Sequence, residues 1–352
     1  MLSPRQSSTR ERTPLDGLWR FAFDPHGAGR TERWWMHPLP GDAEMPVPAS
    51  FNDIVPTREA HDHVGDVWYQ RTVRVPQGWD GQRIVLRFDA ATHRAAAWVA
   101  DRQVVEHEGG YTPFETDVTE LLRAGEETRV TVVVNNELSW TSIPPGYVQE
   151  LDDGRRAQQY FHDFFNYAGL HRSVWLHAMP RVHVADVTVS TTEVAGTTGV
   201  VAYRVVVEGG EEHTVRVTVR DAAGAEVTRA DGSDGTLRID GVELWRPGAG
   251  YLYTLEIEVL APGGELVDVY PQPFGVRTVA VDGHRFLING VPFRFTGFGK
   301  HEDFQVHGRG HDLAVMVHDF GLLEWSGRTR CERRTTRMTR RSWTTRTGTV
   351  SS

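Results

Sequence analysis

The 352-residue sequence predicts a mainly β protein in which two β-sandwich domains precede the first strand and helix of a βα array. Three observations predict this order. Short β-branched runs separated by turn signals fill residues 13 to about 280, and helical periodicity is nearly absent before residue 312. A strand pattern and then a helix pattern follow. Many short strands with regular turns favour sandwiches or jelly rolls over a doubly wound sheet.

The boundary between the two sandwiches is predicted near Pro180. On its N-terminal side, runs such as 83–88 and 129–134 are typical of strands, the loops are long, and tryptophan is frequent. On its C-terminal side, residues 181–277 hold about seven strand patterns, among them 200–207, in a length typical of an immunoglobulin-like sandwich. That segment has no cysteine pair, so the disulfide signature of antibody domains is missing. The sequence therefore predicts only the sandwich architecture of this segment.

The pattern changes again in residues 278–325. Residues 286–293 predict a hairpin, because their Asn-Gly pair favours a tight two-residue turn. Residues 293–299 predict a strand with a glycine-punctuated end. Apolar residues near 3.6 spacing from Asp312 to Trp325 predict an amphipathic helix. A strand followed by a helix is the first unit of a βα array.

Composition limits the kinds of partner and compartment. The 38 basic and 47 acidic residues give a net charge of −9, which argues against a nucleic-acid partner. No apolar run approaches the roughly 20 residues of a membrane span, and the first 12 residues lack the apolar segment of a secretory signal. The single cysteine, Cys331, excludes a disulfide framework and favours a reducing compartment. We therefore expect a cytoplasmic protein without a membrane partner.

Eight segments in order carry a resemblance to a known family. They are 15–19 (LDGLW), 47–53 (VPASFND), 67–71 (VWYQR), 109–114 (GGYTPF), 134–138 (VNNEL), 160–169 (YFHDFFNYAG), 274–277 (FGVR) and 297–303 (GFGKHED). Together they resemble the β-glucuronidases of glycoside hydrolase family 2. The resemblance implies a jelly-roll sugar-binding domain at 1–180, an immunoglobulin-like β-sandwich at 181–277, and the start of a (β/α)₈ catalytic barrel at 278–325. It also implies retaining hydrolysis of β-D-glucuronides.

The resemblance supplies three candidate substrate-binding residues. Asp163 matches a family position at which a jelly-roll loop reaches the barrel mouth, and an ionised carboxylate accepts strongly from sugar hydroxyls. His301 and Glu302 follow the first barrel strand, at the end where such barrels place their sites. The alternatives are that Asp163 caps a turn in a loop packed between domains, and that His301 is a turn histidine without a ligand.

No catalytic, metal or cofactor residue is assigned. Hydrolysis with retention of the anomeric configuration requires two carboxyl groups about 5–5.5 Å apart. In this family they belong to glutamates on later barrel strands. No segment of the sequence matches the motifs of these glutamates. His301, His307 and His311 with Asp303 suggest a metal set, but their spacing resembles no closed zinc site.

Residues 326–352 differ in composition from the rest, with eight arginines and eight threonines. Codons can be chosen for residues 327–337 so that reading from two nucleotides later gives Ala-Asn-Ser-Val-Arg-Thr-Ser-His-Tyr-Pro, which resembles the family's second barrel strand. We interpret this Arg/Thr-rich tail as the product of a frameshift near codon 326. The competing interpretation is a basic tail for nucleic acid or an acidic surface.

The expected function follows in two forms. By resemblance the chain is a β-glucuronidase-type glycosidase that acts on a glucuronide or related sugar. The resemblance is also compatible with a homo-oligomer of the full-length enzyme. The translated chain is expected to be inactive, because a barrel closes with eight strands and the sequence supplies one. The alternative is a non-catalytic carbohydrate-binding or interaction module.

Overall fold

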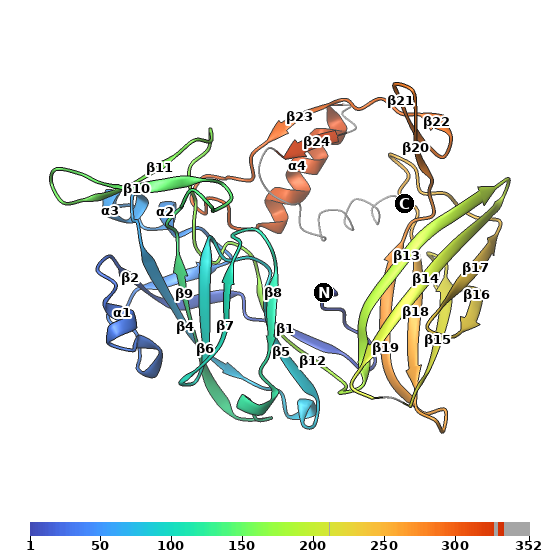
Figure 1. The fold of residues 1–352 in the computed structure, drawn as a ribbon, viewed down its shortest axis with the longest axis horizontal. Coiled ribbons are helices and arrows are strands. Elements are labelled where there is room, and N and C mark those ends of the chain that lie inside the picture. Colours follow the sequence, from blue (N-terminus) through green and yellow to red (C-terminus); the bar gives the residue numbers. More distant parts are fainter. Residues whose placement is uncertain (211, 327–329, 334–352) are drawn as a thin grey trace.

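The computed structural model describes residues 1–210, 212–326 and 330–333. Two β-sandwiches stand side by side, and a smaller part made of a hairpin and a βα segment lies across one end of them (Figure 1). The predicted fold class is confirmed, since strands dominate and the only long helix of the described residues comes near the C-terminal end.

The first sandwich pairs a six-stranded sheet, in the order β3-β2-β4-β9-β6-β7, with a four-stranded sheet, in the order β1-β12-β5-β8. Its strands are β1 (Glu11–Pro14), β2 (Gly17–Asp24), β3 (Glu44–Val47), β4 (Asp66–Arg74), β5 (Arg83–Phe88), β6 (Arg94–Val99), β7 (Arg102–Glu108), β8 (Phe114–Asp117), β9 (Glu127–Asn135) and β12 (Val174–Met179). A separate hairpin, β10 (Gly146–Glu150) and β11 (Arg156–Tyr160), projects from it.

Short helical turns connect these strands. They are α1 (Ala28–Thr31), η1 (Trp34–Met36), α2 (Phe51–Ile54), α3 (Arg58–His61), η2 (Gln77–Trp79) and η3 (Thr119–Leu121). Between the two sheets, large side chains such as Trp19, Phe21, Tyr69 and Leu86 are fully buried. Burial of apolar surface on this scale is the main stabilising contribution to such a sandwich.

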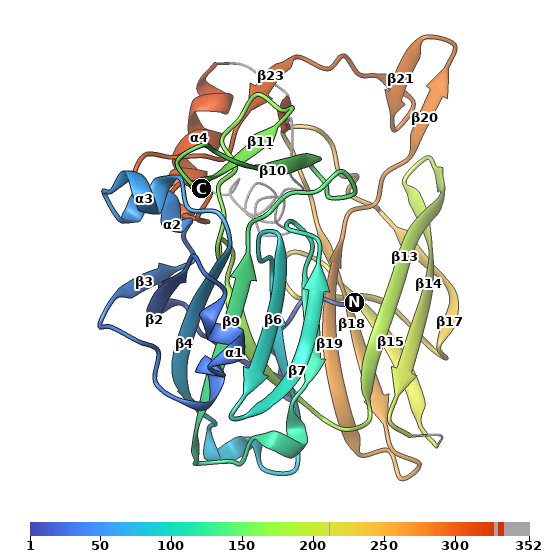
Figure 2. The ribbon, with the colours of Figure 1, turned by 60° about the vertical axis from the view of Figure 1, so that its left-hand side comes forward.

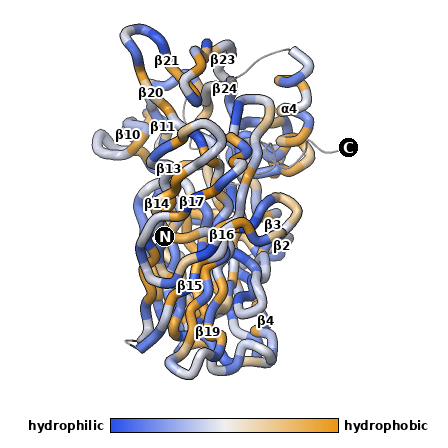
Figure 3. The backbone as a smooth tube through the Cα atoms, turned by 90° about the vertical axis from the view of Figure 1, so that its right-hand side faces the viewer, coloured by the Kyte–Doolittle hydropathy of each residue, from blue (hydrophilic) through white to orange (hydrophobic). Residues whose placement is uncertain are grey.

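The second sandwich has seven strands, as the sequence predicts. A three-stranded sheet, β13-β14-β17, faces a four-stranded sheet, β16-β15-β18-β19. The strands are β13 (His183–Ala195), β14 (Thr198–Glu208), β15 (Thr214–Arg220), β16 (Glu226–Asp231), β17 (Asp234–Asp240), β18 (Tyr253–Leu260) and β19 (Leu266–Phe274). Along β18, Leu255, Ile257 and Val259 are buried while Glu256 and Glu258 are not, which is the two-residue period of a half-buried strand. Figure 3 shows hydrophobic positions along β15 and β19.

The N-terminal segment ties the two sandwiches together. Arg10, just before β1, donates through Nε to Asp268 Oδ1 on β19 at 2.9 Å, and Asp268 also accepts from the backbone N–H of Val184 at 2.8 Å. Both charged side chains are buried. A buried carboxylate with these partners is satisfied, whereas loss of the arginine leaves an uncompensated charge.

The C-terminal part begins with a three-stranded sheet formed by β20 (Val279–Asp282), β21 (Arg285–Ile288) and β22 (Val291–Pro292). Its turn confirms the predicted hairpin, because Asn289 and Gly290 both have positive φ, 51° and 73°.

The strand predicted at 293–299 begins later, as β23 (Gly297–Lys300). The first residues of that range remain with the hairpin. Phe293 donates its backbone N–H to Phe286 at 2.8 Å, and the Phe295 ring lies 5.0 Å from the Phe286 ring. Aromatic packing on the hairpin therefore displaces the start of the strand.

The predicted helix is confirmed as α4 (Leu313–Trp325). Asp312 caps it, since its Oδ1 accepts from the N–H groups of Ala314 at 2.7 Å and Val315 at 3.0 Å. No helix in the described part of the chain has the length and apolar character that a membrane crossing requires.

The described part of the barrel includes one element beyond the predicted first strand and helix. Arg330–Arg333 forms β24, which pairs in parallel with β23 from Gly297↔Arg330 to Lys300↔Arg333. The described residues therefore hold a βαβ unit rather than a single strand and helix. A parallel partner reached through a helix is the usual connection in such arrays. The rest of the Arg/Thr-rich tail, 327–329 and 334–352, lies outside the described residues.

Candidate functional site

The predicted site residues come from two segments that meet at the end of the first sandwich. One is the loop 161–167 that follows β11, and the other is the segment 301–312 between β23 and α4 (Figure 2). Phe164 marks their meeting point and is 6% exposed. Its ring lies 5.9 Å from the His301 ring and 4.3 Å from the Arg309 guanidinium carbon.

This contact joins His301 to the loop that carries Asp163. Asp163 directly precedes Phe164 and is exposed, whereas His301 is half-buried and contacts the Phe164 ring. The structure thus brings an imidazole from the barrel segment against the residue that follows Asp163 in the chain. The carboxylate and the imidazole are both side chains that can hydrogen-bond a sugar hydroxyl.

Glu302 turns toward a residue that the sequence analysis missed. Its carboxylate accepts a charge-assisted hydrogen bond from Arg172 Nη2, and the two form an ion pair. Arg172 also donates through Nη1 to the carbonyl of Arg309 at 3.1 Å. Burial lowers the pKa of Arg172 to about 10, because a low-dielectric environment disfavours the charged form. No periodic pattern singles out Arg172, which stands between His171 and Ser173 just before β12.

Arg309 makes the reciprocal contact, from the barrel segment into the first sandwich. It is 2% exposed, and its Nη1 donates to the Tyr111 hydroxyl at 3.3 Å. Its backbone N–H donates to Ser50 Oγ at 3.1 Å. Burial lowers the pKa of Arg309. A guanidinium over an aromatic face in a desolvated position is worth about 2 kcal/mol.

Glycine allows the barrel segment to lie flat against the sandwich. A Cβ on Gly310 would stand 2.7 Å from the Ala49 Cα and 2.9 Å from the Pro48 carbonyl oxygen. Both are backbone atoms that cannot move aside. Gly310 is therefore required by close approach of two backbones.

The loop that carries Asp163 is anchored at its other end by a buried histidine. His93 Nε2 lies 2.7 Å from Asn166 Oδ1, and Asn166 Nδ2 donates to the carbonyl of Asn136 at 3.2 Å. Burial lowers the pKa of His93 to about 4, so the imidazole is neutral at physiological pH. Fixed at Phe164 and at Asn166, the loop presents Asp163 from a rigid support.

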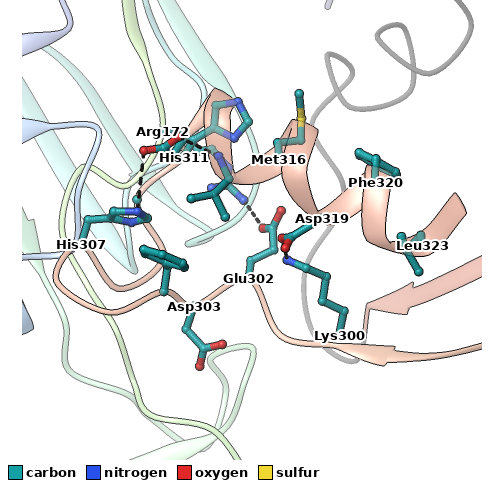
Figure 4. A pocket seen from close by; sticks show the side chains of 14 residues that line it. Arg172, Lys300, Glu302, Asp303, His307, His311, Met316, Asp319, Phe320 and Leu323 are labelled. Atoms are coloured by element: carbon teal, nitrogen blue, oxygen red, sulfur yellow. Dashed lines mark hydrogen bonds and ion pairs between the residues drawn. The ribbon is translucent and has the colours of Figure 1, made fainter. Parts of the chain in front are cut away.

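A hollow next to these contacts lies between β23, the segment 302–312 and α4 (Figure 4). Lys300 Nζ lies 2.6 Å from Asp319 Oδ2 and joins the strand to the helix, while Arg172 reaches in from the sandwich. Asp163 and His301 do not line the hollow. Glu302, the third candidate residue, does line it, so the hollow adjoins the candidate sugar site through Glu302 alone among the three.

The metal interpretation gains no support. Within the described ranges, no three His, Cys, Asp or Glu side chains are arranged to hold a metal ion. His307 stacks on Phe304, with ring centroids 5.2 Å apart, and the N–H of His311 is bonded to the carbonyl of His171.

The fold is thus a multidomain architecture in which a jelly roll and an immunoglobulin-like sandwich precede the opening of a βα barrel, and a sandwich loop packs against the segment after the first barrel strand. Three family models match consecutive parts of the chain: the glycosyl hydrolases family 2 sugar binding domain at 13–180, glycosyl hydrolases family 2 at 180–277, and the family 2 TIM barrel domain at 279–334. The chain belongs to glycosyl hydrolase family 2.

Curated relatives and solved structures show a more specific similarity within this family. The chain is 48% identical to a β-glucuronidase of Paenibacillus borealis over 330 residues, which cover 92% of this chain and 55% of the relative. It is 41% identical to the β-glucuronidase of Felis catus, over 93% of this chain and 54% of the relative. The structure of Ruminococcus gnavus β-glucuronidase superposes with a TM-score of 0.94 at 36% identity, covering 98% of this chain and 58% of that one. The chain thus spans about half the length of the curated relatives it matches.

Proposed function

We propose that this chain is part of a retaining β-glucuronidase and supplies one wall of its glucuronide site. The observation that supports the proposal is the contact of the His301 ring with Phe164, the neighbour of Asp163 in the chain, which joins the first sandwich to the end of the first barrel strand. The substrate class is carried over from the relatives, one of which, from Ruminococcus gnavus, is described in complex with D-glucuronic acid.

Each predicted residue has a proposed role. Asp163 accepts hydrogen bonds from sugar hydroxyls, which a carboxylate does more strongly than a neutral acceptor. His301 contributes a second polar group beside it. Glu302 is the third proposed contact, and its ion pair with Arg172 fixes the direction of its carboxylate. Preorganised groups of this kind bind a ligand without a large ordering cost.

We also propose that the translated chain does not turn over glucuronides. Retention requires a nucleophile and an acid/base held about 5–5.5 Å apart. No segment of the sequence resembles the family motifs that carry them, and the described part of the barrel is one βαβ unit. The frameshift near codon 326 is proposed as the cause of the missing motifs. Sequencing the coding DNA across that codon tests it, and an uninterrupted frame without barrel coding in the shifted frame rejects it.

A chromogenic glucuronide assay tests the function. We expect no turnover by the 352-residue chain and clear turnover by a frame-restored chain. The same restored chain with Asp163→Asn is expected to have a raised KM. Release of glucuronic acid by the 352-residue chain would contradict the proposal, as would full activity of the Asp163→Asn variant.

Domain limits, compartment and assembly remain proposals. The proposed domain boundaries lie between residues 180 and 181, 277 and 278, and 325 and 326. The proposed compartment is the cytoplasm, and the proposed assembly is a homo-oligomer of the full-length enzyme. Separate expression of residues 1–180 and 181–277 tests the limits, since each sandwich has its own buried core.

A second candidate is a carbohydrate-binding module without catalysis. The two separate cores favour it, because each sandwich can fold around its own apolar cluster. Glucuronic acid binding without turnover in a frame-restored chain would support the module over the enzyme.

A further inference from the structure

Two buried histidines of the first sandwich lie where the barrel segment 301–312 meets it. His93, just before β6, and His171, just before β12, are both almost fully buried. Their rings lie 5.8 Å and 5.9 Å from the ring of Tyr111, which contacts both. We refer to His93, Tyr111 and His171 as the histidine layer.

The histidine layer contacts the barrel segment directly. The Tyr111 hydroxyl accepts from Arg309, and the guanidinium carbon of this arginine lies 5.8 Å from the Tyr111 ring centroid. The carbonyl of His171 accepts from the backbone N–H of His311 at 3.0 Å. Arg172, whose side chain forms an ion pair with the segment, directly follows His171 in the chain. A change of charge in the layer therefore acts on the contacts that dock the segment.

The surroundings of both imidazoles suit the neutral form. His93 Nε2 lies 2.7 Å from Asn166 Oδ1, and its Nδ1 has no hydrogen-bond partner among the described residues. Gly110 packs against that atom so closely that a Cβ on the glycine would stand 2.7 Å from it. His171 Nδ1 lies 2.6 Å from Thr92 Oγ1. A second proton on His93 would be a buried donor without an acceptor, which is costly.

Basic groups act on both rings. Arg309 of the barrel segment disfavours a positive charge on His93 and on His171 alike. In the described part of the chain, no carboxylate is hydrogen-bonded or ion-paired with either ring. Further basic groups that act on one ring or the other come from the first sandwich: Arg94, His162 and Arg172.

The carboxylates of this interface act on other groups. Burial lowers the pKa of His93 to about 4 and the pKa of His171 well below its usual value, and the neighbouring cations lower both further. A proton on either imidazole therefore meets buried positive charge without a counter-charge of its own. The interface carboxylates and the groups on which they act are Glu302 on Arg172, Asp303 on Arg309, and Asp163 on His162.

Docking of the segment and proton uptake are therefore linked. When the segment leaves the sandwich, water reaches the imidazoles and their pKa returns toward about 6.5. Below that pH the docked state binds fewer protons than the undocked state, so docking is fully stable above about pH 6.5 and weakens as the pH falls toward 4. Each histidine changes the docking equilibrium by up to about tenfold per pH unit.

We propose that His93 and His171 form an acid-sensitive latch between the first sandwich and the barrel segment 301–312. The latch is closed while both imidazoles are neutral and opens when they take up protons beside Arg172 and Arg309. Opening separates His301 from Phe164 and leaves the two sandwiches folded. The inference concerns how the start of the barrel is held and does not depend on the substrate.

Hydrogen exchange of the 352-residue chain, read by mass spectrometry between about pH 7 and pH 5, tests the latch. Rates are corrected for the intrinsic pH dependence of amide exchange. The reporters are the amides of Arg309 and His311, which donate across the interface to Ser50 Oγ and to the His171 carbonyl. We expect their protection to fall at least about tenfold over this range, while the amides of β4 and β9 stay protected.

Histidine variants identify the groups that take up the protons. His93→Gln and His171→Gln are each expected to remove about half of the pH dependence on a logarithmic scale, and the double variant is expected to remove most of it. The single variants keep the test decisive if the double variant does not fold. The matched control is His183→Gln on β13, since His183 is also buried with a lowered pKa but belongs to the second sandwich. It is expected to leave the protection of 301–312 unchanged at every pH.

Three outcomes would overturn the latch. Protection of 301–312 that stays constant down to pH 5 shows that docking takes up no protons. An equal loss of protection in β4 and β9 shows that the whole sandwich unfolds instead. Full pH dependence in both single variants assigns the protons to other groups.

Discussion

The guanidinium carbon of Arg309 lies 4.3 Å from the ring centroid of Phe164. One residue belongs to the barrel segment and the other to the loop that carries Asp163, and both are buried. Arg172 crosses in the opposite direction, from the sandwich to Glu302. These two arginines make the first sandwich a support for the start of the barrel, so that the candidate sugar site depends on their packing.

Arg309→Ala is expected to destabilise the interface between the sandwich and the barrel segment. The variant removes a desolvated cation–π contact worth about 2 kcal/mol. Chymotrypsin should then cleave faster within 301–312, at Phe304, while the sandwich core unfolds at an unchanged urea concentration. The control is Arg155→Ala, which removes an exposed pair with Asp153. Unchanged proteolysis would show that Arg309 does not hold the segment.

The Arg172–Glu302 pair is expected to be strongly coupled. Arg172→Met removes the buried cation that pairs with the Glu302 carboxylate. Such a removal typically lowers the free energy of unfolding by about 3–5 kcal/mol. The double variant Arg172→Met with Glu302→Gln should recover much of that loss. Urea unfolding of the four proteins gives the coupling energy. Additive effects of the two substitutions would argue against the pair as a structural unit.

Stability is expected to fall as the pH drops below about 6.5. Burial lowers the pKa of His93 to about 4 and that of His177 to about 3, whereas an unfolded histidine titrates near 6.5. Between these values the unfolded chain binds more protons than the folded one. Each histidine therefore lowers the free energy of unfolding by up to about 1.4 kcal/mol per pH unit on acidification, and the His93 effect ends near pH 4.

Urea unfolding between pH 7.5 and 4.5 measures this slope, and His93→Gln should reduce it. Carboxylates with lowered pKa, such as Asp117 and Asp312, act at lower pH and do not mask it. Stability that is constant down to pH 5 would contradict the assignment of neutral, buried imidazoles.

Asp163→Asn is expected to leave the fold intact and to weaken sugar binding. Asp163 is exposed, and hydrogen bonds to a charged group contribute about 1.5–3 kcal/mol, so affinity should fall roughly 10- to 150-fold. Titration with glucuronic acid measures the effect, in the frame-restored chain if the 352-residue chain binds too weakly. Asp153→Asn, at another exposed aspartate of the same sandwich, is the matched control. Equal affinity in both variants would remove Asp163 from the site.

Local patterns were enough for much of the secondary structure. The strand at 83–88, the seven strands of the second sandwich, the Asn-Gly hairpin and the helix α4 all follow from periodicity and turn chemistry, which act over a few residues. The strand predicted from residue 293 failed because packing of Phe295 on Phe286 overrides the local preference. β24 was missed because a basic composition hides a strand whose pairing is set by β23.

By itself the sequence determined the fold class, the family resemblance and three candidate residues, Asp163, His301 and Glu302. Only the tertiary structure decided how they lie: Asp163 and His301 beside Phe164, and Glu302 against Arg172. The physical reason is distance along the chain. Arg172 and Glu302 are 130 residues apart, and no periodic pattern encodes which buried cation will compensate a given carboxylate. That choice is made when the barrel segment packs against the first sandwich and every buried charge must find a partner.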